Sequence, residues 1–265
     1  MRHPARLATL TALIVSVSAL AAASQMVVTI VPSADLTRSV LHRADLTSGG
    51  LLPVGDVGHP VRALAFDPSG DLFGIDALDD RLLRIDHLKG GGEIVGPLGV
   101  DVSDGNLGLA FDDDGRLWMS AYVFGRGHEL YELDPEAGTA RLVGPLDERA
   151  SGGLTMRDGE LLGMGYQLFT IDRTTAGHEP LPESEAGAFV SLGLDHDRAG
   201  RLWTILLCRT CAGPEEVLQL ARIDPSSGEQ KVVEGTVPLP QGLRGLAIRP
   251  SFERSSPAVG RLNLR

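Results

Sequence analysis

Apolar and polar residues alternate along much of the chain in short runs, the pattern of half-buried β-strands. Two such runs are LLRID at residues 82–86 and LYELD at residues 130–134. Sequences such as DPSG and DDDG separate the runs and predict tight turns, because Asp caps a turn and Gly supplies a positive φ. The chain is therefore expected to consist of many short antiparallel strands.

A repeated phrase organises these strands. LGLAFDDDGRLW at residues 107–118 returns as LGLDHDRAGRLW at residues 192–203. A third copy begins at residue 62, and shorter copies begin at residues 152 and 244. Each copy has a leucine at the same place: Leu64, Leu109, Leu154, Leu194 and Leu246. The spacing of 40 to 52 residues between these leucines is typical of propeller blades. We predict an all-β fold, a single β-propeller of five four-stranded blades.

The two ends of the chain carry complementary parts of one blade. Residues 40–45 and 50–56 resemble the third and fourth strands, and residues 244–251 resemble the first. Their pairing would close the ring and remove exposed sheet edges, with the second strand supplied by residues 27–31 or by residues 260–264. Residues 25–265 are therefore expected to form one propeller domain.

Residues 1–24 have the three-part build of a secretory signal peptide. Arg2 and Arg6 precede an apolar run over residues 7–23 that ends in small residues. This run is shorter than the roughly 20 residues that cross a bilayer, and no later segment is long enough. We expect cleavage of the signal, no transmembrane segment in the product, and a periplasmic or secreted location.

Net charge narrows the choice of partner. The formal charge of -11 repels nucleic-acid phosphates and anionic lipid, so nucleic acid is excluded as a partner. The possible partners are therefore a small molecule, a peptide or a protein. We expect the protein itself to be a monomer.

The phrases GLAFDDDGRLW, LYELDPEAG and LVGPL resemble repeats of the NHL, YVTN and SMP-30-like propeller families. The resemblance covers nearly all of the chain after residue 24 and implies a propeller. It does not imply one activity, because such repeats occur in lactonases, lyases, binding modules and scaffolds.

Two motifs of related enzymes are absent. The SMP-30-like gluconolactonases have a Glu-Gly-Pro motif and hold a metal on Glu, Asn and Asp side chains, and only Asn106 and Asp195 match those ligands by position. The propeller-type glutaminyl cyclases have a Phe-Thr-Gln-Gly-Leu motif, of which only QGL at residues 241–243 is present.

Asp195 and His196 break the internal repeat, because Ala110 and Phe111 occupy the same places in the twin segment. A histidine there would serve as a metal ligand or general base. The alternative is a hydrogen-bonded core pair or a locally shifted strand. Asp195, His196 and Asn106 are the candidate catalytic residues. We expect no cofactor, and a divalent metal in the channel is the alternative left open.

The loops that join the fourth strand to the next blade, and the second strand to the third, emerge on one face, where propeller ligands usually bind. We call this the loop-rich face. Its candidate binding residues are Asp101, Asp104, Tyr122, Arg126, His128, Arg149, Tyr166 and Gln241.

Cys208 and Cys211 are the only cysteines. Export predicts that they form a disulfide, with redox catalysis as the alternative.

No recognisable catalytic set accompanies the repeats, and we therefore expect a binding module that uses its loop-rich face. One alternative is an enzyme in the central channel, such as a metal-assisted hydrolase, a lactonase or a lyase. A second alternative is a structural part of a cell-envelope assembly.

Overall fold

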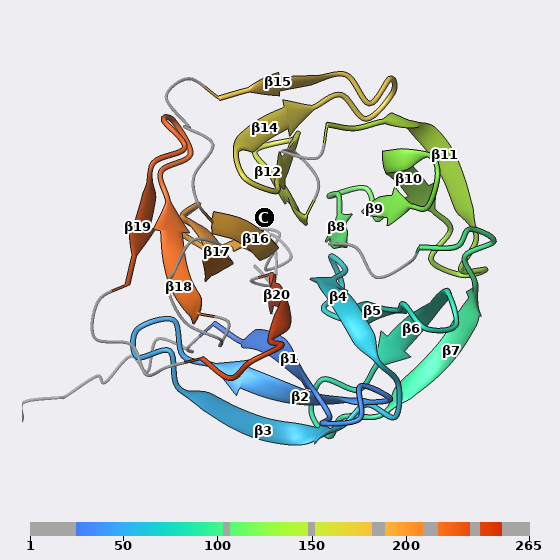
Figure 1. The fold of residues 1–265 in the computed structure, drawn as a ribbon, viewed down its shortest axis with the longest axis vertical. Helices are drawn as coiled ribbons and strands as arrows, with labels where there is room; N and C mark the ends of the chain where they lie inside the picture. The colour runs from blue at the N-terminus through green and yellow to red at the C-terminus, as the bar shows by residue number, and fades with distance from the viewer. Residues whose placement is uncertain are drawn as a thin grey trace, which may run out of the picture.

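The computed structural model describes residues 25–102, 107–147, 152–181, 189–208, 217–233 and 239–250. Twenty strands form five four-stranded antiparallel sheets, arranged as blades around a central axis (Figure 1). The predicted all-β propeller of five blades is confirmed. No helix in these ranges is long and apolar enough to cross a membrane.

The strands of each blade are given from the axis outward. Blade 1 contains β4 (Val61–Phe66), β5 (Leu72–Asp76), β6 (Arg81–Ile85) and β7 (Gly92–Pro97). Blade 2 contains β8 (Gly108–Phe111), β9 (Leu117–Val123), β10 (Gly127–Leu133) and β11 (Ala140–Pro145). Blade 3 contains β12 (Gly153–Arg157), β13 (Glu160–Met164), β14 (Leu168–Ile171) and β15 (His178–Pro180). Blade 4 contains β16 (Phe189–His196), β17 (Leu202–Cys208), β18 (Val217–Ile223) and β19 (Gln230–Val232). Blade 5 contains β20 (Arg244–Ile248), β1 (Val27–Pro32), β2 (Ser39–Ala44) and β3 (Leu51–Asp56).

Both ends of the described chain meet in blade 5, where β20 lies beside β1 (Figure 1). In the register of this pair, Val28 faces Ala247 and Thr29 faces Leu246. The Thr29 hydroxyl also donates a hydrogen bond to the carbonyl of Gly245 at 2.6 Å. The predicted closure is therefore confirmed, with β1 as the second strand. Residues 260–264, the other source considered, lie outside the described residues.

Glycine lets the inner strands approach one another at the axis. The five anchoring leucines are all buried, and in four of the five inner strands a glycine precedes the leucine. A Cβ atom on Gly193 would lie 2.6 Å from the backbone nitrogen of Leu246 in the next inner strand, and one on Gly153 would lie 2.6 Å from that of Leu194. Real Cβ atoms do not tolerate such contacts, so a side chain here would push the blades apart.

The same packing fills the centre of the ring. The space between the glycines and leucines of the five inner strands is a cavity of about 10 Å³. The channel is closed at its middle, and any site on the axis must lie toward one end.

Candidate functional site

A pocket of about 480 Å³ lies on the axis, at the end where the inner strands finish and turn into the second strands. All five inner strands contribute to it, and we call it the axial pocket. Its lining includes Phe66, Phe111, Thr155, Asp195, His196 and Ile248. Two of the three candidate catalytic residues are therefore in one pocket. The third, Asn106, lies outside the described residues.

Asp195 is held by hydrogen bonds from three inner strands. Its Oδ1 atom accepts bonds from the Thr155 hydroxyl at 3.0 Å and from the backbone nitrogen of His196 at 2.7 Å. Its Oδ2 atom accepts a bond from the backbone nitrogen of Ile248 at 2.7 Å. The carboxylate therefore connects β16 to β12 and to β20.

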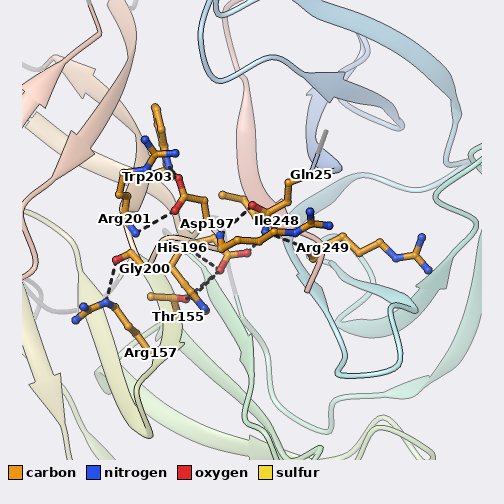
Figure 2. A network of polar contacts seen from close by, with 12 residues as sticks. Gln25, Thr155, Arg157, His196, Asp197, Gly200, Arg201, Trp203, Ile248 and Arg249 are labelled. Atoms are coloured by element: carbon orange, nitrogen blue, oxygen red, sulfur yellow. Dashed lines mark hydrogen bonds and ion pairs between the residues drawn. The ribbon is translucent and has the colours of Figure 1, made fainter. Parts of the chain in front are cut away.

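His196 lies next to this carboxylate, and Figure 2 shows His196 close to Thr155 and Ile248. Its Nδ1 atom is 3.1 Å from Thr155 Oγ1 and 3.4 Å from Asp195 Oδ1. Because the threonine hydroxyl donates its hydrogen to Asp195, its oxygen accepts a hydrogen bond from the His196 Nδ1–H group. Nδ1 is then the ring nitrogen that carries the hydrogen, and Nε2 is the ring nitrogen that can accept a hydrogen bond from a ligand.

Asp195 also controls the charge of His196. The hydrogen bond to Asp195 raises the pKa of His196 above its ordinary value, while burial acts in the opposite direction and is outweighed. The side chain keeps 38% of its surface exposed, so the imidazole remains accessible from the pocket. The raised pKa means that the protonated form of His196 is favoured in the folded chain relative to a free imidazole.

The pair of Asp195 and His196 departs from the internal repeat of the chain. At the equivalent place in blade 2, Ala110 and Phe111 are apolar, and Ala110 packs in the core beside Trp118. In blade 4, Asp195 faces Trp203 across the β16–β17 pair, as Ala110 faces Trp118 in blade 2. The carboxylate therefore occupies an apolar slot and is compensated by donors from neighbouring blades.

Two further aspartates, each in a turn at the rim of the axial pocket, stabilise these turns and bind a tryptophan. Asp112 accepts a hydrogen bond from the indole nitrogen of Trp118 at 3.3 Å, and Asp197 accepts one from that of Trp203 at 2.9 Å. Both aspartates also cap the backbone of their own turns, as the sequence predicted. The bond to tryptophan was not predicted, although the repeated spacing of Asp and Trp in the two twin segments carries the signal.

The lining of the axial pocket is acidic. It includes five aspartates and two arginines, namely Asp112, Asp113, Asp158, Asp195, Asp197, Arg157 and Arg198. Asp112 binds Arg173 at 2.8 Å, and Asp158 binds Arg157 at 3.2 Å. Among the described residues, Asp113 has no ion-pair partner and is exposed at the rim.

The described residues do not fit a divalent metal at this place. They contain no group of three or more His, Cys, Asp or Glu side chains arranged to hold an ion. Both oxygens of Asp195 are already committed to protein donors. We therefore assign no role at this place to the divalent metal that was considered as an alternative from the sequence.

Three of the predicted binding residues belong to one hairpin of the loop-rich face, β9–β10. The rings of Tyr122 and His128 are 5.2 Å apart. Arg126 binds the buried Glu129 at 3.1 Å and donates to the hydroxyl of Tyr131 at 2.8 Å. Burial and the hydrogen bond to Glu129 raise the pKa of Tyr131.

The other predicted binding residues are dispersed. Tyr166 is half-buried between β13 and β14, Gln241 is exposed before β20, and Asp101 is exposed after β7. Asp101 is close to Asp80, whose pKa is raised by burial and, to a smaller extent, by Asp101 and other carboxylates. Asp104 and Arg149 lie outside the described residues. The binding role of the loop-rich face stays a prediction.

The cysteine pair is also only partly described. Cys208 is buried at the end of β17, and Cys211 lies outside the described residues. The predicted disulfide stays a prediction.

Comparison with known proteins shows the class of fold. No family model matches the chain, and no curated protein sequence matches it. TolB from Acinetobacter baumannii superimposes with a TM-score of 0.53 at 14% identity, over 86% of this chain and 67% of its own. A protein of unknown function from Bacteroides thetaiotaomicron gives a TM-score of 0.53 at 13% identity, over 82% and 66%. A gluconolactonase from Xanthomonas campestris gives 0.47 at 17% identity, over 78% and 74%.

The five blades, together with the two matches at a TM-score of 0.53, identify the chain as a β-propeller. The chain spans about two thirds of the length of the first two proteins. The predicted resemblance to propeller repeat families is thus confirmed for the architecture, and at such identities the likeness extends to the fold alone. Function must be argued from the site.

Proposed function

We propose that this chain is a ligand-binding propeller that holds a small polar ligand with a positive charge in its axial pocket. The observation that carries the proposal is the position of His196, whose Nε2 is left for a ligand in an acidic pocket of suitable volume. This differs from the site expected on sequence grounds, because the axial pocket opens at the end of the propeller opposite the loop-rich face.

The charges of the pocket support a cationic ligand. Asp112, Asp195 and Asp197 already accept several hydrogen bonds each, so their role is to stabilise the turns and strands. Asp113 is the carboxylate left to attract a ligand from solvent. Five lining carboxylates face two lining guanidinium groups, and they still outnumber the guanidinium groups by one when Arg173 and Arg201, the partners of Asp112 and Asp197, are counted. A pocket with low-dielectric walls concentrates the field of the remaining charge.

Proton binding at His196 should oppose such a ligand. A neutral imidazole accepts a hydrogen bond from an ammonium group at Nε2, whereas an imidazolium repels it. Ligand affinity should therefore rise with pH as His196 loses its proton.

A panel of monoamines, diamines and quaternary ammonium compounds tests this proposal by calorimetry. We expect at least one class to bind at pH 8, with about tenfold weaker binding in the His196→Gln variant, because a charge-assisted hydrogen bond is lost. The matched control is His178→Gln on β15, outside the axial pocket. Binding that is equal in the two variants, or no binding by any cation, would contradict the proposal.

A second candidate function is proton abstraction by His196. The order of His196 Nδ1, Thr155 Oγ1 and Asp195 Oδ1 favours it, because it holds the ring in the tautomer that presents Nε2 as a base. Turnover of a bound compound by the parent chain, lost in His196→Gln, would establish this function over binding alone. An enzyme of this type would use no metal at Asp195.

We also propose that the protein works outside the cytoplasm. The support is the signal-like pattern of residues 1–24, with its basic start and apolar run. N-terminal sequencing of the product recovered from the periplasm or the medium tests this. A start near residue 24 or 25 is expected, and a product retained in the cytoplasm with Arg2 still present would contradict it.

A further inference from the structure

A second cavity, of about 890 Å³, lies where blade 4 meets blade 5. Its walls come from three strands of blade 4 and from the end of β2 with the turn that follows it. We call it the interblade groove. Apolar atoms of Leu46, Val232 and Val233 line it, and Arg201, Arg222 and Lys231 supply positive charge.

Two of the three cations of the groove, Arg222 and Lys231, lie in one row across blade 4. Trp203 of β17 faces Arg222 of β18, and Arg222 in turn faces Lys231 of β19. Arg222 and Arg201 both lie over the Trp203 ring, at 6.0 and 5.9 Å from its centre. Directly opposed like charges are destabilising in a sheet.

The same two positions carry opposite charges in other blades. Arg84 faces Glu93 in blade 1, and Glu132 faces Arg141 in blade 2, where the two side chains form an ion pair. No other facing pair on the two outer strands of a described blade has two like charges. The pair in blade 4 is thus a departure from the pattern of its own repeat.

The carboxylates near the interblade groove neutralise only part of the positive charge of its arginine and lysine side chains. Arg201 is bound to Asp197 at 2.6 Å, and Lys231 to Glu229 at 3.0 Å in an exposed pair of small energetic value. Asp45 lines the groove, but its carboxylate accepts bonds from Thr47 and Ser48 in its own turn. Within the described part of the chain, Arg222 has no carboxylate partner, and its contact is the indole face.

We propose that the interblade groove is an anion-binding site, in which an oxyanion lies between Arg222 and Lys231 while an apolar part of the same ligand packs against Leu46 and Val232. An anion between the two side chains would supply the negative charge that Glu93 supplies in blade 1 and Glu132 supplies in blade 2. The guanidinium of Arg222 offers paired donors suited to a carboxylate or a phosphate. The groove shares Gln25 and Asp197 with the axial pocket, but the four residues proposed to hold the anion line the groove alone.

Fluorescence of Trp203 reports on this site directly. The chain has two tryptophans, so Trp118→Phe leaves Trp203 as the only one, and Phe73 occupies the matching place in blade 1. The probes are inorganic phosphate, phenyl phosphate and benzoate, each against sodium chloride of equal ionic strength. We expect saturable quenching or shift by phenyl phosphate or benzoate, with tighter binding than inorganic phosphate.

Lys231→Glu tests the like-charge pair, because it recreates the Arg84 and Glu93 arrangement. We expect binding about tenfold weaker or worse and a melting temperature that rises. The chain's other lysine provides the matched control, Lys89→Glu, which makes the same change in net charge on a turn of blade 1. If Lys231→Glu fails to fold, Arg222→Gln is measured in its place.

Three outcomes would overturn the proposal. They are an absence of saturable change with any of the anions, equal affinity in Lys231→Glu and Lys89→Glu, and an effect that sodium chloride reproduces. Because His196 lies outside the interblade groove, His196→Gln should leave anion binding unchanged, so failure of this site and failure of the axial site are distinguishable.

Discussion

Asp195 accepts a hydrogen bond at 2.7 Å from the backbone nitrogen of Ile248, a residue 53 positions later in the chain. The bond joins blade 4 to the strand that closes the ring. With the bond from Thr155, it makes one carboxylate a connection among three of the five inner strands. The residue that breaks the repeat is therefore part of how the propeller is held together at the mouth of the axial pocket.

Asp195→Asn should weaken the fold. An amide has one oxygen, so it cannot serve Thr155, His196 and Ile248 together, and a buried donor loses its partner. We expect the free energy of unfolding in urea to fall by about 1–3 kcal/mol. The control is Asp113→Asn at the rim, where no ion pair is lost. An equal effect of the two substitutions would show that Asp195 does not connect the strands.

His196 gives the fold a predictable pH dependence. Since the bond to Asp195 raises its pKa above the ordinary value of 6.5, the folded state binds the proton more tightly than the unfolded state does. This contribution to stability is fully present below pH 6.5 and is lost as the pH rises through the folded-state pKa. NMR titration of the ring should show a raised pKa in the parent chain and a lower one in Asp195→Asn. A ring that titrates at the ordinary value in both would contradict the account.

Gly193→Ala should disturb the centre of the ring. Its Cβ would meet the backbone of Gly245 and Leu246, which cannot move aside as a flexible side chain can. We expect a loss of stability of at least about 1–3 kcal/mol, the usual cost of overpacking. Gly177→Ala, on an exposed turn where the nearest atom is the Thr175 hydroxyl at 3.1 Å, should have little effect.

Asp197→Asn should change the response to acid. Burial acts to raise the pKa of Asp197, but the bonds from Trp203, Arg201 and Ala199 outweigh it, so the pKa is lowered. A carboxylate with a depressed folded-state pKa stabilises the fold above its unfolded value of 3.8, and this stabilisation is lost as the pH falls below that value. The variant should be less stable at pH 7 and should lose less on acidification. A parallel pH profile for the variant and the parent would contradict this assignment.

Most of the architecture was accessible from the sequence, because each blade repeats the same turn residues and the same leucine. The glycine before that leucine was visible at Gly108, Gly153, Gly193 and Gly245, and its packing role became clear only from the distances to the neighbouring strands. The sequence limited the second strand of the closing blade to two candidate segments, residues 27–31 and residues 260–264. Choosing between them required the observed pairing of Val28 with Ala247.

The site was less accessible. Asp195 and His196 stood out as a break in the repeat. Their partner Thr155 occupies the same repeat position as Asp195, one residue after the anchoring leucine, but a hydrogen bond between positions 40 residues apart could not be read from the repeat alone. The like-charge pair of Arg222 and Lys231 depends on strand register, which a single sequence specifies weakly at the short β19. Contacts between blades are long-range, and periodicity within one strand does not report them.

The central claim is that a cationic ligand in the axial pocket contacts His196. NMR titration of the His196 ring with the tightest-binding amine tests it most directly. The account predicts that saturation shifts the ring resonances and lowers the His196 pKa, because a bound cation disfavours the imidazolium, while the His178 ring is unchanged. A ligand that binds with full affinity and leaves both the resonances and the pKa of His196 unchanged would contradict it.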